Sequence, residues 1–65
     1  MKNYLQKMLS AGLRFDIYGD YSTIGLAWGE SKKARGLGFA RKDVIKALGW
    51  AETHKKESAK IFEIV

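Results

Sequence analysis

The sequence predicts a small α+β protein in which an antiparallel sheet is covered on one face by helices. Apolar residues recur at helical spacing near the N-terminus and again after residue 40. Between these segments the spacing changes to the strict alternation of strands that bury one face. The predicted order of elements is α-β-β-β-α-β. Because the 65 residues contain no linker, repeat or low-complexity tract, we expect one compact domain over residues 1–65.

The first predicted helix covers about residues 3–11. Asn3 has a side chain suited to an N-cap. The apolar side chains that follow lie on one helical face: Tyr4, Leu5, Met8 and Leu9. Gly12 is placed to end the helix in a left-handed conformation, with Leu13 folding back onto Met8 in a Schellman-type contact.

Residues 14–29 predict a β-hairpin. Phe15 and Ile17 face one way, and Gly19 with Asp20 marks the turn. The second strand places three apolar side chains on one face: Ile24, Leu26 and Trp28. Its other face is a strip of small residues, against which we expect a helix, or alternatively a ligand, to pack: Thr23, Gly25, Ala27 and Gly29.

The second half of the chain is predicted as a loop at 30–36, a short third strand at 37–39 and a helix that begins at Arg41. Val44, Ile45 and Leu48 form the apolar stripe of this helix, Gly49 ends it, and Trp50 folds back on Ile45. Both tryptophans are expected in the core. Residues 51–58 fit either a loop or further helical turns. The last segment, 59–65, predicts a closing strand at a sheet edge.

Composition narrows the class of protein. The chain has no Cys, which fits a reducing compartment, and neither a signal peptide nor a membrane span is evident at the N-terminus, so we expect a cytoplasmic protein. Its net charge of +5 favours nucleic acid, an anionic membrane surface or an acidic protein as partner. A membrane role is disfavoured because the apolar face of the second helix is needed to cover the sheet.

Nothing in the sequence predicts an enzyme, a cofactor or a metal site. His54 stands alone beside Lys55 and Lys56, and no serine lies in a nucleophile motif. The turn carboxylates are more typical of solvated acids than of acid–base or Mg²⁺ chemistry. The glycines at 36–38 are a weak match to a nucleotide-binding loop because Arg41 replaces its third glycine.

The strongest functional signal is a basic cluster between residues 32 and 46, in which Asp43 is the one acid. We define it by its cations: Lys32, Lys33, Arg35, Arg41, Lys42 and Lys46. Arg41 and Lys42 lie in the first helical turn, where the helix dipole disfavours positive charge. A phosphate bound there would reverse that effect. The alternative is that Asp43 satisfies the helix end and the lysines keep the surface soluble.

Tyr18 and Tyr21, on the polar side and turn of the hairpin, are predicted to stack on bases or to line a protein contact. The resulting hypothesis is a non-catalytic regulator that binds DNA or RNA through phosphate contacts of the basic cluster. The rival hypothesis is an interaction module or small inhibitor that docks on an acidic protein. In that case the terminal edge strand pairs with the partner, or with a second copy to form a homodimer.

Overall fold

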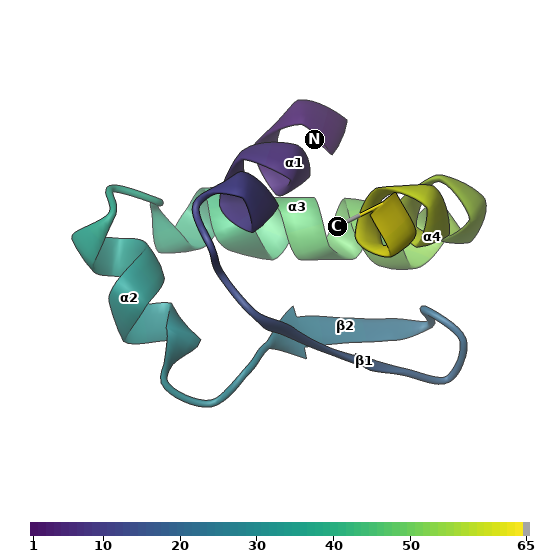
Figure 1. The fold of residues 1–65 in the computed structure, drawn as a ribbon, viewed down its shortest axis with the longest axis horizontal. Helices are drawn as coiled ribbons and strands as arrows, with labels where there is room; N and C mark the ends of the chain where they lie inside the picture. Colours follow the sequence, from purple (N-terminus) through teal and green to yellow (C-terminus); the bar gives the residue numbers. More distant parts are fainter. Residues whose placement is uncertain (65) are drawn as a thin grey trace.

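The computed structural model describes residues 1–64 and has four helices and a two-stranded antiparallel hairpin. The elements run α1 (Lys2–Ser10), β1 (Phe15–Tyr18), β2 (Thr23–Leu26), α2 (Glu30–Gly36), α3 (Arg41–Thr53) and α4 (Lys55–Ile64). Figure 1 shows α3 in the middle, with α1 above it, the hairpin below it and α4 beside its C-terminal end. The α+β class is confirmed, and the predicted order α-β-β-β-α-β is wrong.

Helix α1 ends as predicted. The N–H of Gly12 donates to the carbonyl of Leu9 at 3.0 Å, and the N–H of Leu13 donates to that of Met8 at 3.2 Å. Gly12 has φ 88, so these bonds form a Schellman motif with glycine at its left-handed position. Leu13 is buried with Leu5 and Met8, which fixes the direction in which the chain enters the hairpin.

The hairpin also follows the prediction. Phe15 pairs with Leu26 and Tyr18 with Thr23, which leaves residues 19–22 as the connection. Phe15 and Ile17 pack against the core, and Ile24 is buried. On the outer edge of β2, the N–H of Ile24 donates to Oε2 of Glu52 at 2.9 Å and so attaches the hairpin to α3.

The outer face of the hairpin differs from the prediction. A Cβ added at Gly25 would meet no atom within 4 Å, so within residues 1–64 nothing packs against this position of the small-residue strip. Trp28 is not in the core but 99% exposed. The reason is that β2 ends at Leu26, and the chain turns before the alternation can return Trp28 to the buried face.

Residues 30–36, predicted as a loop, form α2, and the predicted strand at 37–39 is the end of that helix. Gly38, with φ 92, donates its N–H to the carbonyl of Arg35, and Phe39 donates to that of Ala34. This is a second Schellman motif. Ala34 is the buried residue of α2, and so short and polar a segment shows no helical stripe in the sequence.

Helix α3 begins at Arg41 as predicted but continues through Gly49 to Thr53. Gly49 is exposed, and a Cβ there would meet nothing within 4 Å, so this face of the helix points to solvent. The buried stripe instead extends from Val44 and Ala47 to Ala51. Trp50 does not fold back on Ile45. Its ring stacks on His54, with centroids 4.5 Å apart and an angle of 14° between the planes.

The terminal strand prediction is also wrong, because 55–64 is α4. Ser58 and Ile61 are buried, and Phe62 contacts Phe15 edge-on at 5.3 Å between centroids. Positions 58, 61 and 62 share one helical face, whereas a strand would place 61 and 62 on opposite faces. Val65 lies outside the described residues.

The helices and the hairpin share one buried cluster: Leu5, Met8, Leu13, Ile24, Ala34, Val44, Ala47, Ala51 and Ile61. Three of these are alanines on α2 and α3, whose small side chains allow close approach of neighbouring elements. Among the four helices of residues 1–64, none combines the length and the apolar character needed to cross a membrane.

Candidate functional site

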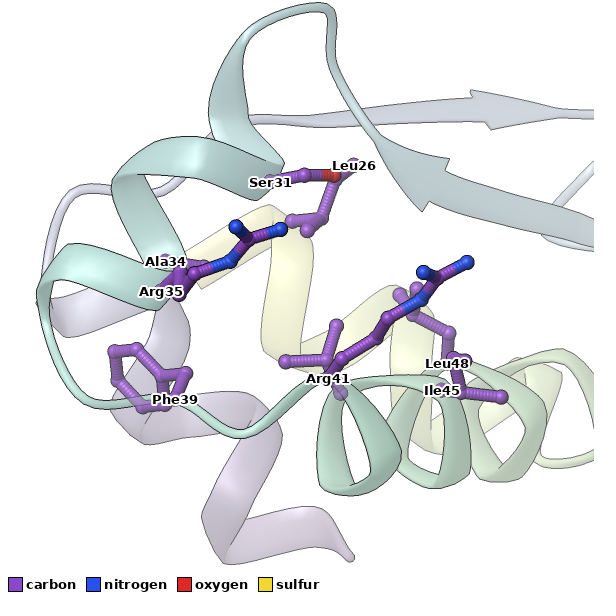
Figure 2. Close-up of a pocket in the computed structure, with 9 residues that line it drawn as sticks. Leu26, Ser31, Ala34, Arg35, Phe39, Arg41, Ile45 and Leu48 are labelled. Carbon is purple, nitrogen blue, oxygen red and sulfur yellow. The ribbon is translucent and has the colours of Figure 1, made fainter.

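Two members of the basic cluster, Arg35 of α2 and Arg41 of α3, line the same surface hollow (Figure 2). The hollow lies between α2, the first half of α3 and the end of β2, and its volume is about 440 Å³. Its lining is Leu26, Ser31, Ala34, Arg35, Phe39, Arg41, Val44, Ile45 and Leu48. In Figure 2 the Arg35 side chain extends from α2 into the opening, and the Arg41 side chain extends along α3 toward Leu48. The fold therefore brings together two cations that come from different elements.

The hollow has an apolar floor below its two cations. Ala34 and Val44 are buried, while Ile45 is 58% exposed and leaves apolar surface open to solvent. The Schellman turn at Gly38 determines this arrangement, because it reverses the chain between α2 and α3 and places Phe39 at one end of the hollow. A ligand that combines an anionic group with a flat or apolar group would fit both the rim and the floor.

The start of α3 has no side-chain cap. Ala40 occupies the N-cap position without a side-chain hydrogen bond, and Arg41 and Lys42 follow it. Asp43, the acid of the first turn, does not line the hollow but lies beside Tyr4 on the α1 side. Burial raises the pKa of Tyr4 above its ordinary value, and the nearby carboxylate of Asp43 raises it further. Asp43 therefore acts on the opposite side of the helix start from Arg35.

The other cations of the cluster are spread over the surface, although all are exposed. Lys33 points the other way from Arg35, and its Nζ donates to the carbonyl of Gly12 at 3.1 Å, which ties α2 to the end of α1. Lys42 and Lys46 are one turn apart on α3 and do not line the hollow. Lys32 is exposed on α2. The structure thus places Arg35 and Arg41 together and directs the lysines elsewhere.

Carboxylates on the same two helices are engaged with the backbone. Oε1 of Glu30 on α2 accepts the N–H of Arg14 at 2.6 Å. Glu52 on α3 accepts the N–H of Ile24. Neither carboxylate lines the hollow, so its charged lining is formed by the two arginines.

A comparison within the molecule shows that cations at a helix start are not sufficient evidence of a site. Helix α4, like α3, begins with two cations followed by an acid, here Lys55, Lys56 and Glu57. The surface depression beside them includes Glu52 and Glu57 together with the lysines, so its charges are mixed. The start of α3 differs because the neighbouring helix supplies Arg35.

The two predicted aromatic contacts have different environments. Tyr18 is 63% exposed on the outer face of β1. Tyr21 is half-buried, and its ring lies 6.1 Å from that of Phe62. The prediction missed Trp28, which is far more exposed than either tyrosine. The signal for it is the Trp-Gly pair directly after the alternating strand, which is typical of a turn.

The described part of the chain has no group of three His, Cys, Asp or Glu side chains that could hold a metal ion. His54 has a structural environment, because its ring stacks on Trp50 and its Nδ1 donates to the carbonyl of Trp50 at 2.8 Å. These contacts finish the C-terminal end of α3.

Comparisons with protein-family models, with curated proteins and with solved structures find no match. Inference of function therefore depends on the geometry of Arg35, Arg41 and the hollow between them.

Proposed function

We propose that the protein binds nucleic acid, DNA or RNA, without catalysis, through phosphate contacts made by Arg35 and Arg41. The observation that supports this most directly is that these two exposed side chains, from different helices, line one hollow. Lys42 and Lys46 would extend the contact along α3, and Lys32 along α2. Lys33 contributes mainly by holding α2 to Gly12. Such a protein would suit a small cytoplasmic regulator.

The charge of the two arginines favours a phosphate ligand. An arginine presents a planar fork of N–H donors that binds phosphate oxygens in pairs. Two such forks without a carboxylate in the same lining repel each other, and a bound phosphate removes that repulsion. The net charge of +5 adds a longer-range attraction toward a polyanion. Affinity should therefore fall steeply with salt, because each phosphate contact releases condensed counterions.

A second candidate function is docking on an acidic protein. The observation that favours it is the apolar floor of the hollow, in particular Ile45, which is 58% exposed. An amphipathic acidic segment would cover this floor and pair with the two arginines. A homodimer remains part of this candidate, but residues 59–64 are helical, so it would use apolar surface instead of the terminal strand.

A pair of charge-reversal variants tests the proposal. In the first, Arg35 and Arg41 are both replaced by Glu; in the matched control, Lys55 and Lys56 are replaced by Glu. Both change the net charge equally, and all four positions are exposed. Binding is measured by fluorescence anisotropy with labelled duplex and single-stranded oligonucleotides at about 50 and 200 mM salt.

Nucleic-acid binding predicts that the Arg35/Arg41 variant loses affinity and that its salt slope falls by roughly 1 for each phosphate contact removed. The Lys55/Lys56 control should lose only the small, non-local share caused by lower net charge. Equal losses in both variants would mean that the hollow is not the site. Absence of binding by the unmodified protein at about 50 mM salt would reject nucleic acid and leave the acidic protein partner.

A further inference from the structure

Trp28 is the most exposed large apolar side chain described in residues 1–64, at 99%. Tryptophan is on average strongly buried in folded proteins, and burying one removes a large apolar area from water. This ring gains no such stabilisation from the fold. Its position therefore calls for an explanation outside the packing of the core.

The backbone at Trp28 is fixed by hydrogen bonds, although its ring is exposed. The N–H of Glu30 donates to the carbonyl of Ala27 at 3.0 Å, which closes a turn around Trp28 and Gly29. Gly29 has φ 85 and ψ −13, the conformation of the third residue of a type II turn, so Trp28 occupies the second.

Two further bonds tie this turn to the hairpin. The N–H of Ala27 donates to the carbonyl of Arg14 at 3.1 Å, and the N–H of Arg14 donates to Oε1 of Glu30 at 2.6 Å. The turn therefore has defined anchors on both sides of Trp28. A ring presented from such a turn loses little conformational freedom on contact, because tryptophan has only two side-chain torsions.

The charges near Trp28 in the chain indicate what would contact it. Ser31, three residues after Trp28, lines the hollow that carries Arg35 and Arg41. Arg14 lies across the hairpin from Ala27, and the carboxylate of Glu30 is occupied by the N–H of Arg14. A ligand that spans this turn and the hollow would contact both a flat aromatic face and two cations. That combination of groups is complementary to a base with its attached phosphates.

We propose that Trp28 is a stacking residue for an unpaired base, and that the nucleic acid bound at the hollow is single-stranded around this contact. This inference rests on the proposed function. In a duplex both faces of each base are already stacked, and exposing one requires unpairing. A strand that is already single presents a free base face to the ring while its phosphates lie on Arg35 and Arg41. The contact is to the base face, which DNA and RNA share.

The test uses Trp50→Phe as its background, so that Trp28 is the one remaining indole. Trp50 is a suitable position because its ring stacks on His54 and does not line the hollow. The probes are an oligothymidylate, an oligouridylate and a duplex DNA of equal length, at about 50 and 200 mM salt. Both indole fluorescence and anisotropy of labelled probes are recorded.

Stacking predicts that both single strands quench Trp28 and that the duplex does not. Trp28→Ala should weaken single-strand binding by roughly 5- to 100-fold and duplex binding by less than about twofold. Trp28→Phe should recover part of the loss, and Trp50→Phe alone should bind as the unmodified protein does.

The contrary outcomes are distinct. If single strands bind with a salt dependence that requires Arg35 and Arg41, but neither quench Trp28 nor respond to Trp28→Ala, stacking is wrong and the proposed function stands. Equal quenching by the duplex would overturn the preference for unpaired bases. If no probe binds at about 50 mM salt, the proposed function fails and stacking fails with it, which leaves Trp28 as a contact for a protein partner.

Discussion

The two ends of α3 are finished in different ways. At the C-terminal end, Ser58 donates its hydroxyl to the carbonyl of Ala51 at 2.6 Å. Thr53 and His54 both donate to the carbonyl of Trp50, at 3.0 and 2.8 Å. At the N-terminal end, Ala40 provides no side-chain cap, and Arg41 and Lys42 oppose the helix dipole. One end is closed by internal hydrogen bonds, and the other, which we call the open end, has no side-chain cap.

Because of this difference, we expect residues at one end of α3 to determine stability and residues at the other end to determine binding. At the corner between α3 and α4, Ala51, Ser58 and Ile61 are buried, so changing them should alter the free energy of unfolding. Groups at the start of α3 are exposed, so changing them should alter what the surface attracts and should affect folding only slightly. The C-terminal end of α3 also helps to position the hollow. Glu52, near this end, accepts a hydrogen bond from the N–H of Ile24 in β2, and Leu26, the last residue of β2, lines the hollow.

The largest effect is expected from Ile61→Ala in α4. Ile61 is 5% exposed, so the substitution removes buried methyl groups and leaves a cavity, and unfolding should become easier by ~2–5 kcal/mol. A chain of this size has a total stability of only a few kcal/mol, so the variant should be partly unfolded at physiological temperature. Urea denaturation followed by circular dichroism measures the change.

The control for this variant is Ile45→Ala on α3, the same chemical change at a residue that is 58% exposed. Its effect should stay below about 1 kcal/mol because little apolar area is lost. Similar losses in the two variants would contradict the assignment of the α3–α4 corner as the stabilising end.

Ser58→Ala should have the next largest effect. Ser58 is fully buried, and its loss leaves the carbonyl of Ala51 with only the longer bond from the N–H of His54, at 3.3 Å. Loss of a hydrogen bond costs about 1 kcal/mol, which the urea midpoint would report. Ser10→Ala, on an exposed residue at the end of α1, should change the midpoint by no more than about 0.5 kcal/mol. A neutral Ser58→Ala would mean that water reaches the Ala51 carbonyl.

Two glycine-to-alanine substitutions should change the stability of the protein in opposite directions. Gly38 has φ 92 at the end of α2, so Gly38→Ala should destabilise the protein by about 1 kcal/mol. Gly49 lies inside α3 with open space at its Cβ position, so Gly49→Ala should stabilise it by ~0.5–1 kcal/mol. Thermal unfolding of both variants measures the difference. A destabilising Gly49→Ala would restore the original prediction that the helix ends at this glycine.

The sequence predicts some elements of the fold correctly and misses others. The end of α1 and the pairing of the hairpin are predicted correctly because each segment contains its own stripe or alternation together with a turn residue. The predicted N-cap Asn3 is wrong, because α1 begins at Lys2 with Met1 as its N-cap. Helix α2 was missed because Ala34 is its one buried residue, although the glycine at 38 repeats the signal recognised at Gly12. Helix α4 was missed because Ile61 and Phe62 favour strands in isolation. Packing on Phe15 decides their conformation, and that contact is not local in sequence.

The candidate site was predicted in part. The density of positive charge predicts Arg35 and Arg41 as site residues. That both line one hollow depends on the turn at Gly38, a residue that the sequence predicts in a strand. Lys33 could not be separated from its neighbours, because the bond to Gly12 joins residues far apart in the chain. Trp28 was assigned to the core because alternation was extended two residues beyond the real end of β2. Sequence periodicity locates elements better than it locates their ends.

The smallest effect on stability, and the sharpest comparison of the helix ends, comes from Lys42→Glu. Lys42 is the second residue of α3, so an acid there should stabilise the helix by ~0.3–1 kcal/mol through the dipole. Lys56→Glu is the matched control, since Lys56 is the second residue of α4 and is also exposed. Each new Glu lies four residues before a lysine, Lys46 or Lys60, so the added side-chain pairing is the same in both.

Substitution of Lys42 should therefore change stability and nucleic-acid affinity in opposite directions, whereas substitution of Lys56 should change stability alone. Lys42→Glu should raise the melting temperature slightly while lowering nucleic-acid affinity, with a salt slope reduced by about 1 if Lys42 contacts a phosphate. Lys56→Glu should give the same small gain in stability with little change in affinity, because acids share its surface. A loss of affinity of equal size in both variants would show that net charge alone attracts the ligand. The open end of α3 would then have no local role.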